Sequence, residues 1–291
     1  MNKKNYLVYI AFGNDDFRNE AMSSILSYLL LKPQPDDATV LIYTDLPGHF
    51  KALETAPVPI VCNEIKPEQW KLWRGHIDFV HRIKIEVILH TILTYGGNTL
   101  YVDSDTYFLK SPAPVFEALA KGERFMHVYE STLKTSKGFH ASVYENLKKY
   151  PEAEWYHTLS GASMYNAGVI GLSATEEPLL RKVLALTDTL YALHPTHVME
   201  QLSFSMSMPI DGRLEQAAPY ILHYWHMKDI RPVLSEFFKQ HQGVSTAALV
   251  EAYAKLPVLE ASRTKDKWEL KKRWQRALMR IAGRGWKWPA H

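Results

Sequence analysis

Short apolar runs that alternate with helix-like segments are the feature that most constrains the fold of this chain. The runs are rich in Val, Ile, Leu and Tyr, and each is followed by polar residues. They predict strands at Tyr6–Phe12, Val40–Tyr43, Val58–Cys62 and Thr99–Val102, with one helix ending near Leu31 and another over 76–95 that stops at Gly96. This alternation predicts an α/β fold with a mixed, mostly parallel sheet covered by helices on both faces.

The second half of the chain has a weaker pattern. We expect strands at Val169–Leu172 and Tyr220–Tyr224, and helices at Glu177–Ala192 and His197–Met206, whereas residues 130–160 have no clear assignment. From about residue 235 the pattern is helical and basic. We therefore expect an α/β domain over residues 1–235 and a basic, amphipathic helical extension over 236–291.

Two carboxylates interrupt an apolar run in the stretch LYVDSDTYFL, residues 100–109. Buried charges need partners, and Asp103 and Asp105, two residues apart at a strand end, are expected to point the same way. Two such carboxylates suit Mg²⁺ or Mn²⁺ with open positions for phosphate oxygens, at the edge of the sheet where ligands bind. A surface turn with two solvated acids is the simpler alternative.

Two known patterns compete for this motif. In a haloacid dehalogenase-type phosphohydrolase Asp103 would be the nucleophile, but a threonine is then expected four residues later, where Tyr107 stands. The other pattern is the DxD motif of GT-A glycosyltransferases, which lies about as far along the chain as it does here. The position and the apolar flanks favour the second. A non-catalytic nucleotide-sugar-binding protein is a further alternative.

Five segments in order resemble the retaining GT-A glycosyltransferases of family 8, which includes glycogenin and bacterial lipopolysaccharide galactosyltransferases. They are Arg82–Ile85 (RIKI), Leu100–Thr106 (LYVDSDT), Tyr165–Ile170 (YNAGVI), Glu200-Gln201, and His223–Lys228 (HYWHMK). The chain departs from the family in three places. Glutamate replaces aspartate before Gln201, the glycine and Lys-Pro-Trp pattern after the late histidine is absent, and Lys228 lies one residue closer to that histidine than in the family.

The resemblance implies a hexosyltransferase that moves a sugar from a nucleotide-sugar, most simply a UDP-sugar, to a hydroxyl of a glycan or glycolipid with retention of configuration. It implies Mn²⁺ or Mg²⁺ held by Asp103, Asp105 and His223, with His226 as the alternative histidine. The expected donor-binding residues are Ala11, Phe12, Gly13, Arg82, Asp103, Ser104, Asp105, Gly168 and Lys228. The expected catalytic residues are Asn166, Glu200 and Gln201, near the reacting sugar, where Glu200 or Gln201 would act as a stabiliser or as a nucleophile.

The C-terminal segment carries most of the charge asymmetry. The whole chain has a net charge of +3, yet residues 263–291 contain ten Lys or Arg and two Asp or Glu. With Trp274, Leu278 and Ile281 at helical spacing, this segment is typical of a helix on an anionic membrane surface, although docking on its own domain or on a partner subunit is an equal alternative. No nucleic-acid partner is expected.

The location is expected to be cytoplasmic, with possible peripheral attachment to the inner face of the membrane. The single cysteine, Cys62, provides no disulfide framework. The N-terminal run is short and reads as a first strand rather than a signal peptide.

Overall fold

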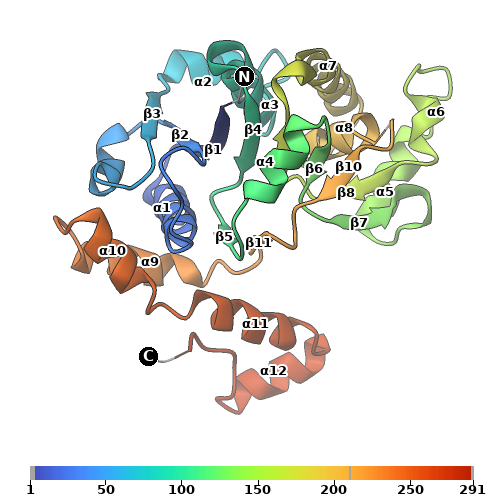
Figure 1. Cartoon of the computed structure of the whole chain (residues 1–291). Helices are drawn as coiled ribbons and strands as arrows, with labels where there is room; N and C mark the ends of the chain where they lie inside the picture. The colour runs from blue at the N-terminus through green and yellow to red at the C-terminus, as the bar shows by residue number, and fades with distance from the viewer. Residues whose placement is uncertain (1–3, 210, 290–291) are drawn as a thin grey trace.

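A computed structural model describes residues 4–209 and 211–289 and shows a central seven-stranded sheet (Figure 1). The strand order is β10-β6-β9-β4-β1-β2-β3. Strands β4, β1, β2 and β3 run parallel, whereas β9 is antiparallel to both β4 and β6. The seven are β1 (Asn5–Ala11), β2 (Thr39–Thr44), β3 (Ile60–Glu64), β4 (Asn98–Val102), β6 (Arg124–Met126), β9 (Val169–Leu172) and β10 (Leu214–Gln216).

Two short antiparallel pairs and a set of helices complete the fold. The pairs join β5 (Thr106–Phe108) to β11 (Ile221–His223), and β7 (Tyr129–Thr132) to β8 (Ser163–Tyr165). The α-helices are α1 (Asp15–Leu29), α2 (Pro67–Trp73), α3 (Arg82–Tyr95), α4 (Ala113–Ala120), α5 (Phe139–Leu147), α6 (Tyr156–Leu159), α7 (Glu177–Leu193), α8 (Met199–Ser207), α9 (Ile230–Gln240), α10 (Thr246–Tyr253), α11 (Val258–Glu269) and α12 (Arg273–Ile281). Three 3-10 helices lie at Pro47–Leu53, Leu133–Thr135 and Ala174–Glu176.

Alternate residues of the central strands enter two different cores. In β1, Leu7, Tyr9 and Ala11 face a core that includes residues of α1, α4, α9 and α10. Tyr6 and Val8 face the opposite core, which includes residues of α3 and α7. Because a strand buried on both sides has no solvent-facing positions, it is apolar throughout, as the predicted mostly parallel sheet requires. The predicted α/β class with helices on both faces is therefore confirmed.

A third, smaller core supports the segment that sequence patterns left unassigned. It is formed by residues of α5, α6, α7, α8 and β8 and by neighbouring loop residues, among them Leu133, Val143, Leu147, Met164 and Met199. This unit lies beside the β10–β6 end of the sheet in Figure 1 and has its own buried apolar contacts. It gives residues 129–165 a defined place at one side of the molecule.

The helix predicted over 76–95 begins only at Arg82. The preceding residues form turns in which Gly75 and Asp78 have positive φ angles of 67° and 51°. A right-handed helix cannot continue through such residues. Phe79 instead packs in the third core. The apolar residues at 77 and 80 have helical spacing in the sequence but do not belong to a helix. The helix ends before Gly96, as predicted.

Helices α9 and α10 share the core of the sheet. Phe237, Leu249 and Tyr253 are buried in the same cluster as residues of β1 and α1. The domain boundary expected between residues 235 and 236 falls inside α9. Only α11 and α12 extend below the α/β unit, as the orange-red end of Figure 1 shows.

Candidate functional site

Strand directions bring three distant segments of the chain to one point. Asp103 and Asp105 follow β4, and β9 runs antiparallel to β4, so the residues just before β9 lie beside them. The amide of Asp103 donates to the carbonyl of Gly168 (2.8 Å), which extends this ladder. Strand β11 pairs with β5 so that His223 lies opposite Thr106, one residue after Asp105.

The two aspartates and one histidine form a cluster that fits a divalent cation. One ligand atom from each of Asp103, Asp105 and His223 lies within 4.8 Å of the others. The His223 Nε2 atom is 3.1 Å from Asp105 Oδ1 and 3.8 Å from Asp103 Oδ2. Two carboxylates with an imidazole are a donor set suited to Mn²⁺, and the carboxylates equally suit Mg²⁺.

Asn166 and Gly168 hold the histidine in place. The Nδ1 atom of His223 and the Oδ1 atom of Asn166 lie 2.9 Å apart, which directs Nε2 toward the aspartates. A Cβ atom on Gly168 would collide with the His223 ring. The Asn-Ala-Gly segment therefore positions the histidine as well as the wall of the site.

His226, the alternative ligand, lies elsewhere. Its Nε2 atom is 2.8 Å from Asp266 Oδ1 in helix α11, and it does not line the cavity. The structure thus brings His223, rather than His226, to the aspartates.

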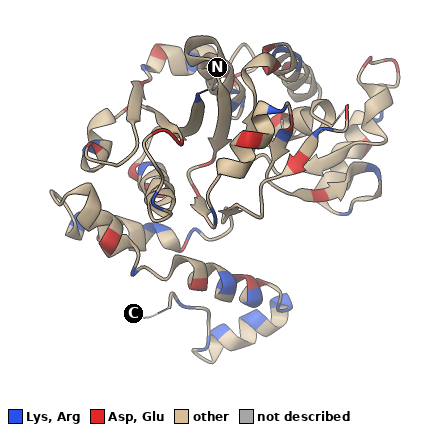
Figure 2. Cartoon of the chain, viewed as in Figure 1, with Lys and Arg blue, Asp and Glu red and all other residues tan. Residues whose placement is uncertain are grey.

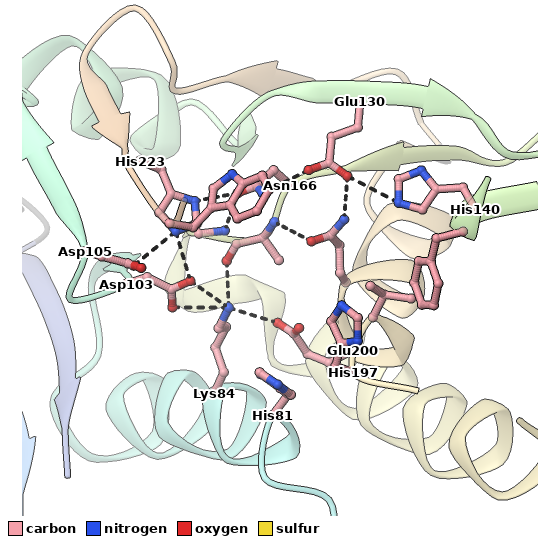
Figure 3. A pocket seen from close by; sticks show the side chains of 16 residues that line it. His81, Lys84, Asp103, Asp105, Glu130, His140, Asn166, His197, Glu200 and His223 are labelled. Atoms are coloured by element: carbon pink, nitrogen blue, oxygen red, sulfur yellow. Dashed lines mark hydrogen bonds and ion pairs between the residues drawn. The ribbon is translucent and has the colours of Figure 1, made fainter. Parts of the chain in front are cut away.

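Lysine side chains balance the negative charge. Lys228 Nζ lies 2.6 Å from Asp105 Oδ2. Lys84, from α3, points between Asp103 and Glu200, with its Nζ atom 3.3 Å from a carboxylate oxygen of each and 2.8 Å from the carbonyl of Ala167 (Figure 3). Burial favours the neutral amine, but the two carboxylates outweigh it and raise the pKa of Lys84.

The carboxylates respond differently to their surroundings. Burial would raise the pKa of Asp105, yet the hydrogen bonds and charges of His223 and Lys228 outweigh it and hold that pKa well below its ordinary value. For Glu200, burial dominates and the charge of Asp103 adds to it, so its pKa is raised to about 7 even though Lys84 acts in the opposite direction. Asp105 is therefore an anion ready to bind a cation, whereas Glu200 titrates near neutrality.

A cavity of about 490 Å³ opens from this cluster. The Gln201 side chain lies on its wall, where its Nε2 atom donates to Glu130 Oε2 (2.9 Å) and its Oε1 atom accepts from the amide of Ala167 (3.4 Å). Asn166 Nδ2 donates to the other oxygen of Glu130 (3.0 Å). The residues along the wall are His81, Lys84, Asp103, Asp105, Glu130, Phe139, His140, Asn166, Ala167, Gly168, His197, Val198, Glu200, Gln201, His223 and Trp225.

Arg82 does not face this cavity. Its guanidinium pairs with Asp188 (2.8 Å) and Glu86 (2.6 Å) and donates to the carbonyl of Trp73. Lys84, two residues later in the same RIKI segment, is the cation that faces the cavity. Sequence reasoning missed it, although a lysine between two isoleucines on a buried helix face is a detectable signal.

The residues at the end of β1 also lie apart from the cavity wall. Ala11 is fully buried, and the Phe12 ring stacks on Trp70 with centroids 3.8 Å apart. The amide of Gly13 donates to Asp45 Oδ2 (3.2 Å). Ser104 is half-buried between the two aspartates. Glu130, His140 and His197 line the cavity but were not predicted, because no pattern assigned the segment that contains the first two.

The sheet, its flanking helices and the Asp-Asp-His cluster define a fold of the GT-A glycosyltransferase type. Mouse xyloside xylosyltransferase 1 (apo form) is similar at a TM-score of 0.50 and 10% identity over 73% of this chain and 84% of that one. The glycosyltransferase GlyE of Streptococcus pneumoniae is similar at 0.50 and 12%, over 87% of this chain and 63% of that one. An active-site mutant of LgtC is similar at 0.48 and 13%, over 72% and 71%.

At these identities the likeness establishes the fold alone. No protein-family model matches the chain, and no curated protein sequence is significantly similar to it. The resemblance to GT-A glycosyltransferases expected from the DxD and NAGV segments is confirmed at the level of the fold and the metal-type cluster.

Proposed function

We propose that this protein is a metal-dependent glycosyltransferase that moves a hexose from a UDP-sugar to a hydroxyl group of a glycan or glycolipid, with retention of configuration. The observation that carries the proposal is the Asp103–Asp105–His223 cluster at the edge of a GT-A-type sheet. Mn²⁺ or Mg²⁺ held by these residues would supply a Lewis acid for the diphosphate of the donor.

The chain's own residues supply the remaining chemistry. Lys228, which lies 47% exposed beside Asp105, would hold a phosphate oxygen and stabilise the charge that develops on the leaving UDP. Lys84 is buried and fixed by Asp103 and the carbonyl of Ala167, so it contributes a positive charge whose position does not change. Gln201 and Asn166 present amides to the cavity, where they would orient the sugar.

The test is a calorimetric titration of UDP into the protein with and without Mn²⁺. We expect binding that requires the metal and that Asp105→Asn abolishes. Asp36→Asn, a change of the same kind at an exposed residue before β2, is the matched control and should bind as the wild type does. Retained UDP binding in Asp105→Asn would contradict the proposed site.

Turnover separates the remaining alternatives. A panel of UDP-sugars, with release of UDP as the readout, should identify a donor. Binding without any turnover would favour a non-catalytic nucleotide-sugar-binding protein. Release of phosphate from simple phosphate esters, lost in Asp103→Asn and indifferent to uridine, would favour a phosphohydrolase instead.

We also propose that helix α12 attaches the protein to an anionic membrane surface, which would place a lipid-linked acceptor near the cavity. Large apolar side chains of α12 are exposed, namely Trp274 (60%), Leu278 (57%) and Ile281 (84%), and so is Leu270 (86%) just before the helix. Lys and Arg accompany them, and Figure 2 shows the concentration of blue on α11 and α12. Among the described residues no helix is long and apolar enough to cross a bilayer.

Part of the C-terminal segment packs against the rest of the protein. Trp268 is 5% exposed, Trp286 and Trp288 pack against the core, and Trp286 Nε1 donates to Thr264 Oγ1 (3.1 Å). Docking on the protein's own domain, one of the alternatives from the sequence, is therefore seen for part of the segment, and membrane attachment is proposed for the rest. Helix α11 and the last tryptophans dock on the protein, whereas the apolar face of α12 has no cover among the described residues.

Vesicle flotation tests this attachment. The variant Trp274→Ser with Ile281→Ser should float less with phosphatidylglycerol-rich vesicles, because apolar insertion and charge act together in such helices. Leu72→Ser with Leu93→Ser, two exposed apolar residues on α2 and α3, is the control. Equal flotation of the two variants would contradict membrane attachment through α12.

A further inference from the structure

The cavity has a second end, away from the metal-type cluster, that the proposed reaction leaves without a role. Figure 3 shows His140 and His197 on the opposite side of the cavity from Asp103 and Asp105. Phe139 and His197 stack there, with ring centroids 5.2 Å apart and an angle of 16° between the planes. Phe139 remains 45% exposed, so one aromatic surface borders the cavity.

Polar groups beside this ring are fixed by hydrogen bonds. Glu130 accepts from the amides of Asn166 and Gln201, which hold its carboxylate at the cavity wall. The Nδ1 atom of His140 lies 2.9 Å from Ser131 Oγ, and its Nε2 atom lies 3.6 Å from Glu130 Oε2. The outer end of the cavity thus combines an aromatic face with an ordered carboxylate and imidazole.

The stacked rings of Phe139 and His197, called the platform below, are held by buried contacts. Phe139 is the first residue of α5, and α5 packs through Val143 and Leu147 into the third core. His197 lies directly before Val198 and Met199, which belong to the same core. Two stacked rings held from two elements by one buried cluster keep their orientation, which a binding surface needs.

We propose that Phe139, His140, His197 and Glu130 form the acceptor subsite and that it binds an uncharged pyranoside. A sugar ring has an apolar C–H face that suits the Phe139 ring and a rim of hydroxyl groups that suits the Glu130 carboxylate and the His140 imidazole. The Glu130 carboxylate lies at this end of the cavity, where its hydrogen-bond partners are neutral amides, and it disfavours an acidic sugar. This inference rests on the proposed function, because it names the acceptor class for that reaction.

Saturation-transfer NMR with Mn²⁺ replaced by diamagnetic Mg²⁺ tests the subsite in the full-length protein. The probes are methyl glucosides, methyl galactosides, cellobiose and a methyl glucuronide, each in the presence of UDP. We expect saturation at the ring C–H protons of at least one neutral pyranoside and about tenfold weaker binding of the glucuronide.

Variants assign the signal to the platform. Phe139→Leu should weaken pyranoside binding about tenfold, whereas Phe139→Tyr, which keeps an aromatic ring, should bind as the wild type does. Phe17→Leu is the matched control, since Phe17 is 39% exposed on α1 and does not line the cavity. UDP binding that fails in the wild type would count against the proposed function itself.

UDP binding without pyranoside binding, or pyranoside binding that is unchanged in Phe139→Leu, would overturn the acceptor subsite alone. Stronger binding of the glucuronide than of the neutral sugars would overturn the part of the inference that concerns charge. A general loss of folding in Phe139→Leu is recognised by the loss of UDP binding in the same sample.

Discussion

At the scale of single residues, the site depends on a glycine that leaves room for an imidazole. The carbonyl of Gly168 accepts from the amide of Asp103, and the space where its side chain would lie is filled by the His223 ring. The sequence pattern Asn-Ala-Gly predicted that this segment belongs to the site. It could not show that the glycine serves the histidine 55 residues later, because that contact arises only from strand pairing.

We therefore predict that Gly168→Ala displaces His223. Overpacking of this kind lowers the free energy of unfolding by about 1–3 kcal/mol. Loss of one of three ligands should weaken metal binding at least tenfold, which corresponds to about 1.4 kcal/mol or more of binding free energy. Urea denaturation and calorimetric Mn²⁺ titration measure the two effects. Gly161→Ala, where a Cβ atom meets nothing within 4 Å, should change neither. Wild-type metal affinity in Gly168→Ala would contradict the role assigned to this glycine.

The buried Glu200 makes a second prediction at this scale, which concerns pH. Its pKa is raised from 4.5 to about 7 in the folded protein, chiefly by burial. Between these pH values the folded state holds a proton on Glu200 that the unfolded state has released, so the contribution of Glu200 to stability falls as the pH rises from about 4.5 to 7. His81 and His127, whose pKa values burial lowers to about 4, contribute in the opposite direction, so the effect of Glu200 is read as a difference between wild type and variant. The interval corresponds to about 3 kcal/mol at 1.36 kcal/mol per pH unit.

Glu200→Gln removes this titration, so the stability of the wild type relative to that of the variant should fall as the pH rises from about 4.5 to 7. Urea unfolding of the metal-free protein at several pH values between 4.5 and 8 measures it. Glu260→Gln, in the first turn of α11, is a control at an exposed glutamate. Parallel stability curves for wild type and Glu200→Gln would show that Glu200 ionises normally in the folded state.

At the scale of elements, helices were predictable where one apolar face alone determined them. Residues 177–193 have a clear helical period, and α7 agrees with the prediction at its start and within one residue at its end. The helix over 76–95 was predicted too long, because periodicity does not reveal that the backbones of Gly75 and Asp78 adopt positive φ. The platform on α5 could not be predicted, since its core is assembled from segments distant in sequence.

The attachment of α10 to α1 leads to an element-scale prediction. Tyr253 and Ser23 are fully buried, and their hydroxyl oxygens lie 2.6 Å apart. Tyr253→Phe leaves Ser23 with one partner fewer and should lower the free energy of unfolding by about 1–2 kcal/mol. Tyr144→Phe, at a half-buried residue on α5, is the control. The expected loss in a single cooperative transition would show that α10 unfolds together with the sheet, whereas no loss would mean that residues beyond 235 are energetically separate.

At the scale of the whole molecule, the class of fold was predictable, as was the place of Lys228 beside Asp105, but the orientation of Arg82 and Lys84 was not. Apolar runs reveal a mostly parallel sheet, and motifs in order along the chain reveal which ends of its strands carry chemistry. Which of two neighbouring cationic residues faces the cavity depends on helix rotation. Arg82 forms ion pairs with Asp188 and Glu86, whereas Lys84 forms ion pairs with Asp103 and Glu200 at the cavity.

The same assembly links ligand binding to global stability. The cluster and its lysine partner come from the β4–β5 turn, β11 and the segment before α9, so a bound ligand joins parts of the chain that separate on unfolding. A ligand that binds only the folded state stabilises it by about 2.7 kcal/mol at one hundred times its dissociation constant. For a domain of this size we expect Mn²⁺ with UDP to raise the melting temperature by roughly 5–10 °C.

Thermal unfolding followed by circular dichroism measures this shift. Asp105→Asn should melt at the same temperature with and without Mn²⁺ and UDP, because the cluster has lost a charged ligand, and Asp36→Asn should shift as the wild type does. An equal shift in Asp105→Asn would place the nucleotide and metal elsewhere on the molecule. A shift confined to part of a biphasic transition would mean that the sheet and the segments around the site unfold independently, against the shared cores that join them.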